Sequence, residues 1–161
     1  MPLIRYSSPR RSKPVGALLP ALLLALVAGG WQIAGALLIT VTTIEFGGTF
    51  LLRITSGKHS EFTDFQRSMF RAGHAHAGVL VILALVALLF TDQAGLPTGI
   101  GWAERIGFAS APVLVSGGFF GAAMGKGRTR PGGLIAMLWI GVFVLGASLV
   151  TLGACLIRGR G

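Results

Sequence analysis

Three side chains in this sequence have the type and setting of a chemical site: Glu45, His74 and His76. The two histidines stand in the segment Arg71-Ala-Gly-His-Ala-His-Ala-Gly78, and all three residues lie in or at the start of long apolar runs. Ionisable groups in apolar surroundings usually lie against a partner, a cavity or an ion, because burying an isolated charge is costly. We therefore take Glu45, His74, His76 and Arg71 as the candidate polar site.

Three interpretations of this site are open. In the first, the polar side chains are structural, and Glu45 bonds an arginine or a nearby threonine. In the second, the site handles protons or a polar solute, because histidine titrates near neutral pH and intramembrane Glu–His pairs recur in proton relays. In the third, His74, His76 and Glu45 hold a metal ion or a haem, since imidazoles and a carboxylate suit zinc, copper or iron.

Helix geometry weakens the third interpretation. Residues i and i+2 point about 200° apart on a regular helix, so His74 and His76 do not both face one ion. A bis-histidine haem would need a second chain, because the remaining histidine, His59, falls in a loop. The sequence itself requires no cofactor. It also has no phosphate-binding glycine loop, no His-Glu-x-x-His and no nucleophile elbow, so an enzyme is the weaker class.

The composition is that of a membrane protein. Of 161 residues, 53% are hydrophobic and 12% are charged, whereas soluble domains have about 25% charged residues. The net charge of +9 does not indicate nucleic-acid binding, because the basic residues stand between apolar runs rather than along a polar face. We expect an all-α, integral membrane helical bundle with the lipid bilayer as its partner.

The lengths of the apolar stretches set the number of helices. These stretches are 15–53, 74–90, 106–124 and 133–157. A spanning helix needs roughly 20 residues, so the first stretch is too long for one helix and is expected to turn at Gly29-Gly30, ahead of Trp31. The sequence thus predicts five transmembrane helices (14–29, 31–54, 72–91, 105–124 and 132–157) between a basic segment 1–13 and a short tail 158–161. A cleaved signal peptide over residues 1–29 is the rival interpretation, with a poor cleavage pattern.

Charge orients the expected helices. With five helices, the three basic segments lie on one side and the acidic loop with Asp92 and Glu104 lies on the other. The positive-inside rule then places the N-terminus in the cytoplasm. The abundance of Ala, Gly and Leu, with Arg exceeding Lys, suits a GC-rich bacterial genome. We therefore expect a multi-pass protein of a bacterial plasma membrane.

The depths of the polar residues bring the glutamate and one histidine together. At about 1.5 Å of rise per residue, Glu45 lies about 12 Å beyond Arg53, and His76 lies about 7.5 Å beyond Arg71. If both arginines lie at the membrane interface, the carboxylate and an imidazole reach similar levels on neighbouring antiparallel helices. One histidine is then expected to face Glu45 while the other faces the loop or the interface.

Glycines at a four-residue period predict close packing by the 105–124 helix. Gly117, Gly121 and Gly125 would form one small-residue stripe, and such stripes let the backbones of membrane helices approach one another. The stripe joins helices within one chain, within a homo-oligomer or within a larger membrane complex.

The run Phe70-Arg-Ala-Gly-His-Ala-His-Ala-Gly-Val-Leu80, with Glu45-Phe-Gly47 upstream, resembles small uncharacterised integral membrane proteins of actinobacteria. That resemblance implies an inner-membrane protein and no particular activity. His-x-His segments at helix starts also look like pieces of haem-copper oxidase-related membrane proteins, which use many more histidines. We expect a small transport or proton-handling component; an accessory subunit of a larger complex is the alternative, and a metal- or haem-binding redox protein is third.

Overall fold

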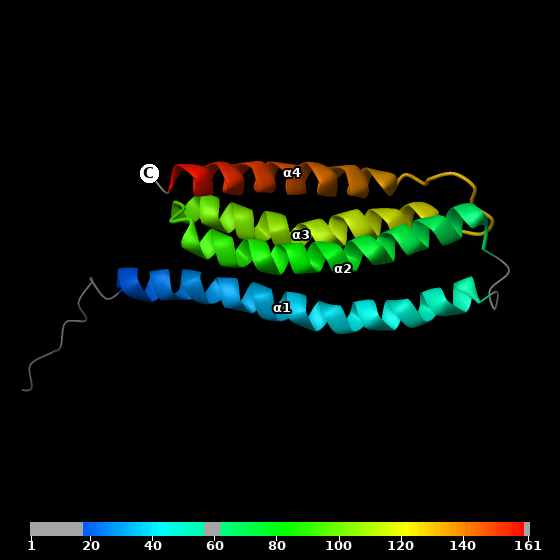
Figure 1. Ribbon diagram of the computed structural model, residues 1–161, viewed down its shortest axis with the longest axis horizontal. Helices are drawn as coiled ribbons and strands as arrows, with labels where there is room; N and C mark the ends of the chain where they lie inside the picture. The colour runs from blue at the N-terminus through cyan, green and yellow to red at the C-terminus, as the bar shows by residue number, and fades with distance from the viewer. Residues whose placement is uncertain (1–17, 57–61, 160–161) are drawn as a thin grey trace, which may run out of the picture.

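The protein is all-α, as predicted. A computed structural model describes residues 18–56 and 62–159, with side chains from Gly30 onward. In this part of the chain, four helices follow one another: α1 (Leu18–Thr55), α2 (Asp64–Gln93), α3 (Thr98–Ala123) and α4 (Ile135–Arg158) (Figure 1). The basic segment 1–13, the first residues of the helix expected at 14–29 and the end of the 158–161 tail lie outside the described residues.

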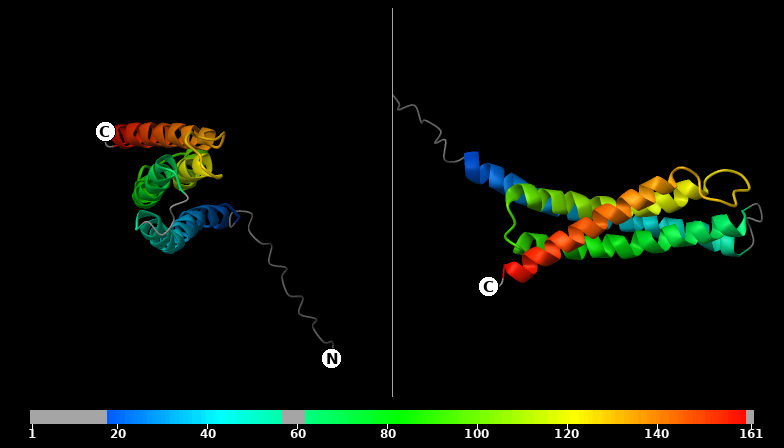
Figure 2. Two further views of the ribbon diagram at one scale, coloured as in Figure 1. Left: turned by 90° about the vertical axis from the view of Figure 1, so that its right-hand side faces the viewer. Right: turned by 90° about the horizontal axis from the view of Figure 1, so that it is seen from above.

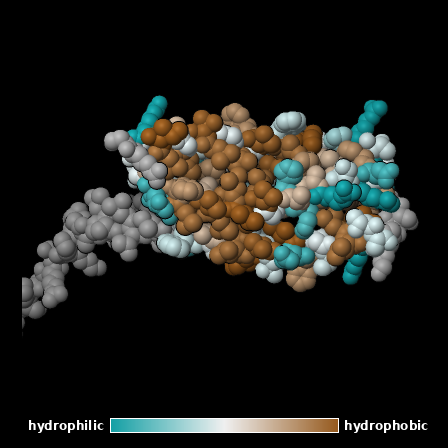
Figure 3. All heavy atoms as spheres, in the orientation of Figure 1, coloured by the Kyte–Doolittle hydropathy of each residue, from teal (hydrophilic) through white to brown (hydrophobic). Residues whose placement is uncertain are grey.

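Each of the four helices is long and apolar enough to cross a membrane. The spanning stretches are Gly30–Thr55, Asp64–Gln93, Thr98–Ala123 and Ile135–Arg158, and this pattern is typical of a multi-pass membrane protein. Figure 3 shows hydrophobic residues over the middle of the visible face and hydrophilic residues gathered toward its two ends. The predicted membrane class agrees with these helices.

The prediction of five helices is wrong because α1 does not turn at Gly29-Gly30. The helix continues through both glycines for 38 residues, or about 57 Å. A break in apolar surroundings leaves backbone groups without partners, which costs more than the roughly 1 kcal/mol that each glycine costs a helix. Gly30 instead faces the side chains of Arg105 and Asp92, and a Cβ at this position would lie 3.4 Å from the Arg105 Nε.

The helices are stacked in a row rather than closed into a ring. α3 packs against α2 and α4 along most of its length, while α1 packs mainly on α2. Among the described residues α1 and α4 make no contact, and Figure 2 shows them on opposite sides of the α2–α3 pair. The core therefore centres on α3, where Phe108, Ala111 and Ala122 are fully buried.

Small residues bring α3 and α4 together, although only part of the predicted stripe does so. A Cβ on Gly121 would lie 2.8 Å from the Leu134 Cδ1, and one on Gly117 would lie 3.4 Å from a methionine methyl group of α4. Gly125 lies beyond the end of α3, at a φ of 111°, where it supports a turn rather than a helix contact. The closest approach to the backbone of α4 is at Gly118, which the stripe omits.

The first turn of α2 holds the end of α3. Thr63 caps α2 in a reciprocal pair of hydrogen bonds with Gln66, so the helix begins at Asp64 rather than near residue 72. The buried Gln66 amide then donates to the Ala123 carbonyl at 2.9 Å and to the Gly125 carbonyl at 2.7 Å. These bonds fix the connection between α3 and α4 against the start of α2.

Candidate functional site

His74 lies on the side of α2 that faces α1. A Cβ built on Gly47 would lie 3.5 Å from the His74 Nδ1, and one built on Gly48 would lie 3.6 Å from its Nε2. The imidazole therefore rests against a surface of α1 that has no side chains. It is partly exposed, and it makes no hydrogen bond or ion pair with any residue that the structure describes.

His76 lies on a different side of α2. Its ring centroid is 4.9 Å from that of Phe119, on α3. Its Nδ1 donates a hydrogen bond to the Ala72 carbonyl at 2.8 Å, one turn earlier in the same helix. The two imidazoles thus contact different helices, as a separation of about 200° requires, and the histidine on the α1 side is His74 rather than the more deeply placed His76.

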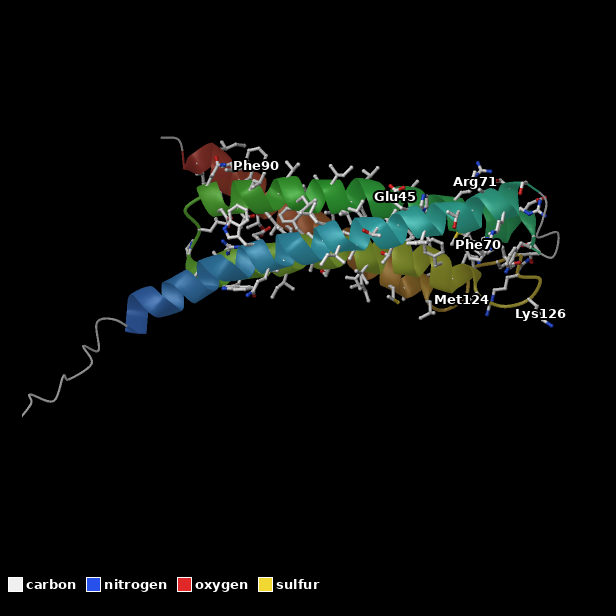
Figure 4. All side chains as sticks on the ribbon, turned by 90° about the horizontal axis from the view of Figure 1, so that it is seen from below. Glu45, Phe70, Arg71, Phe90, Met124 and Lys126 are labelled. Atoms are coloured by element: carbon white, nitrogen blue, oxygen red, sulfur yellow. The ribbon has the colours of Figure 1, made fainter. Side chains whose placement is uncertain are left out.

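Glu45 lies on α1 one helical turn before Gly48, and it is exposed. Figure 4 shows it farther than Arg71 from the end of the bundle that carries the α1–α2 and α3–α4 connections, in agreement with the depths worked from the sequence. It has no hydrogen bond or ion pair within the described residues. The structure therefore brings His74 to the part of α1 that carries Glu45, without a bond between the two side chains.

Arg71 lies closer to the connecting loops and takes no part in this contact. It is exposed and lines a cavity of about 320 Å³ with Asp64 and Arg67. Asp64 and Arg67 form an ion pair of 3.7 Å. In residues 30–56 and 62–159, no three His, Cys, Asp or Glu side chains gather closely enough to hold a metal ion.

A buried carboxylate that the sequence analysis missed lies between α3 and α4. Glu104 was placed in a loop, but α3 begins at Thr98, so this residue lies inside the helix and is 5% exposed. Ser148, on α4, lies beside its carboxylate, whose Oε2 atom has no hydrogen-bond partner in the described part of the chain. Gly107 leaves the room that the Ser148 hydroxyl fills. Pro97, which precedes the helix, is the signal that would have placed the start correctly.

An ion pair closes the same end of the bundle. Arg105, near the start of α3, bonds the Asp92 carboxylate near the end of α2 at 2.5 Å. Both side chains lie beside Gly30 of α1, so three helices meet there. Asp92 is thus bonded to a neighbouring side chain and Glu104 is buried, whereas Glu45 and His74 have no bonded partner among the described residues.

Comparison with protein-family models, curated proteins and solved structures finds no match to this chain. The candidate residues are therefore compared by their own side-chain contacts, which separate the residues that are held in place from those that are not bonded. By these contacts His76, Glu104 and Asp92 are held in place, and the α1–α2 contact carries two titratable groups without bonds in the described part of the chain.

Proposed function

We propose that the protein is a small proton-handling component of a membrane, with His74 and Glu45 as its working groups. This proposal rests on the position of the His74 imidazole, which lies against Gly47 and Gly48 of α1, one helical turn from Glu45. Both residues lie inside stretches that are apolar and long enough to span a bilayer. Intramembrane ionisable residues of this kind mark ion pathways and proton relays.

The chemistry follows from the freedom of these two groups. An imidazole has two ring nitrogens that can accept and donate protons, and a ring without a fixed hydrogen bond is free to turn between two partners. The His76 ring is held in one orientation, because its Nδ1 donates to the Ala72 carbonyl. The His74 ring has no such bond among the described residues, and the two glycines of α1 leave room for it. The Glu45 carboxylate likewise has no bonded partner in the described part of the chain.

Proton flux in proteoliposomes tests the proposal. The purified full chain is reconstituted with a trapped pH-sensitive dye, and a pH gradient is imposed under a valinomycin-clamped potential. We expect flux above that of empty liposomes, and we expect His74→Ala and Glu45→Gln each to abolish the excess. His76→Ala is the matched control, since it removes an imidazole two residues away on another side of α2, and it should retain the flux. Wild-type flux equal to that of empty liposomes, or equal loss in all three variants, would contradict the proposal.

An accessory role in a larger assembly is the second candidate, and the isolation of α1 favours it. Only 11% of its most apolar stretch is buried, against 50% for α3. Large side chains such as Ile39, Phe46 and Leu52 are each about seven-tenths exposed (72%, 73% and 69%) on this helix, which also carries the exposed Glu45. A helix from a second copy or another protein would cover this face and give the carboxylate a partner.

Cysteine cross-linking in native membranes separates the two roles. Phe46→Cys, in a Cys155→Ser background, should form a cross-linked product if α1 faces another helix. Phe143→Cys, which is 76% exposed on α4, is the control on the opposite side of the bundle and should remain uncross-linked. The accessory role is wrong if neither variant yields a product in the native membrane.

The proposed location is a bacterial plasma membrane with the N-terminus in the cytoplasm. Four helices remove the charge argument for this orientation, because each end of the bundle then receives seven of the 14 basic residues. The end of the bundle that carries the two connections has Arg53, Lys58, Arg67, Arg71, Lys126, Arg128 and Arg130; by chain order the other seven are Arg5, Arg10, Arg11, Lys13, Arg105, Arg158 and Arg160. The orientation therefore rests on segment 1–13, which has four basic residues and no acidic one. Labelling of Gly127→Cys, in a Cys155→Ser background, by a membrane-impermeant reagent on intact cells supports it, and protection refutes it.

A further inference from the structure

A cavity of about 550 Å³ lies where α2 begins and α3 ends, and neither Glu45 nor His74 lines it. Its walls are Phe62 and Phe70 on one side, and Ala123, Met124 and the turn that follows on the other. Figure 4 shows Phe70, Met124 and Lys126 together at this end of the bundle. The volume is in the range of about 300–1,000 Å³ that is typical of sites for small molecules.

The inside of this cavity is apolar. Phe62 and Phe70 meet edge to face, with centroids 5.5 Å apart, and Phe70 stacks on Phe120 at 5.9 Å. Gln66 is the polar side chain in the wall, and both protons of its amide are used by the carbonyls at the end of α3. Its side-chain oxygen accepts from the Thr63 backbone. The wall therefore offers an occupant apolar contact rather than hydrogen bonds.

The rim of the cavity is positively charged. Lys126 lines it and is exposed, and it has no hydrogen bond or ion pair with a described residue. The connection from Met124 to Leu134 also carries Arg128 and Arg130 and contains no acidic residue. An occupant that complements both parts has an apolar chain and a negatively charged head.

We propose that this cavity binds an anionic phospholipid, with one acyl chain against Phe62, Phe70 and Met124 and the phosphate beside Lys126. The position fits this ligand, because the start of α2 and the end of α3 are ends of helices long and apolar enough to span a bilayer, and the ends of spanning helices lie near the headgroups. A basic residue at that level attracts anionic lipid at about 1 kcal/mol, or about fivefold in occupancy. The inference does not depend on proton transfer by His74.

Native mass spectrometry of the purified full chain tests this site with phosphatidylglycerol and phosphatidylcholine of identical acyl chains. We expect the wild type to retain phosphatidylglycerol about fivefold better, and Lys126→Ala to remove that preference. Arg158→Ala deletes one exposed charge at the other end of the bundle and should leave the preference unchanged. Met124→Glu places a carboxylate at the mouth and should release phosphatidylglycerol even if Lys126→Ala retains some.

Three results would overturn the inference. Equal retention of the two lipids by the wild type shows that the head charge is not recognised. Equal losses in Lys126→Ala and Arg158→Ala show a general effect of net charge rather than a site. Displacement of bound lipid by inorganic phosphate shows a simple anion site, because free phosphate has no chain to fill the apolar cavity.

Discussion

Alanine at Gly118 is expected to force α3 and α4 apart. An added Cβ would lie 2.4 Å from the backbone nitrogen of Leu138, 2.6 Å from its Cβ and 2.7 Å from its Cα. Because ordinary contacts between carbon atoms are about 3.5–4.0 Å, α4 must move by about 1 Å. Neighbouring backbone atoms cannot rotate away as the end of a flexible side chain would.

The size of the effect follows from two opposed contributions. Overpacking of a close contact costs about 1–3 kcal/mol, and the backbone clash places Gly118→Ala toward the upper end. Replacement of a helical glycine by alanine returns at most about 1 kcal/mol. We therefore expect a net loss of about 2 kcal/mol in the free energy of unfolding, or roughly 30-fold in the folding equilibrium.

Unfolding in mixed micelles with a rising fraction of sodium dodecyl sulfate measures this change, followed by tryptophan fluorescence. Gly146→Ala is the matched control on α4, because nothing lies within 4 Å of a Cβ at that position. It should be neutral or slightly stabilising. If the two variants unfold at the same detergent fraction, the close α3–α4 contact at Gly118 is not part of the folded protein and the reasoning is refuted.

Three further substitutions test other contacts by the same unfolding measurement. Gln66→Ala leaves the buried Ala123 carbonyl and the partly buried Gly125 carbonyl without their side-chain partner and should cost about 1–3 kcal/mol; a neutral result would contradict the proposed role of these bonds in holding the end of α3. Ser148→Ala removes the hydroxyl beside the buried Glu104 carboxylate and should destabilise by about 1–3 kcal/mol, an effect that Glu104→Gln should largely offset if the buried charge is its cause. Asp92→Ala breaks the partly exposed pair with Arg105 and should cost no more than about 1 kcal/mol, so a larger loss would show that this pair organises the turn.

The sequence predicted that His74 and His76 face different sides of their helix, but not which of them lies against α1. Helical periodicity correctly separated His74 from His76, because two residues always turn a helix by about 200°. Depth alone favoured His76 as the neighbour of α1, and the rotation of α2 about its axis decided for His74 instead. That rotation is set by how α2 packs on α3, through contacts such as His76 on Phe119, and no local pattern records it.

The start of α3 was not recovered from the sequence. The segment Thr98-Gly-Ile-Gly-Trp102 contains two glycines and reads as a loop, so Glu104 was assigned to solvent. In the structure this segment is helical and the carboxylate is covered by Ser148 of α4. Glu104 and Ser148 are more than forty positions apart. Their contact and the Arg105–Asp92 pair favour a helix in this segment, although the composition of the segment does not indicate one.

The sequence by itself determined that the chain makes long apolar helices suited to a membrane, because backbone hydrogen bonds in a helix are local and the length of an apolar run measures its span. Tertiary structure decided what the glycines do. Gly118 permits either a turn or a close approach, and the helix that packs against it selects the close approach, whereas Gly30 stays within α1. Tertiary structure likewise decided that His74 rests against Gly47 and Gly48 of α1 and that Glu104 is buried, since the facing of one helix toward another depends on the whole set of packed contacts.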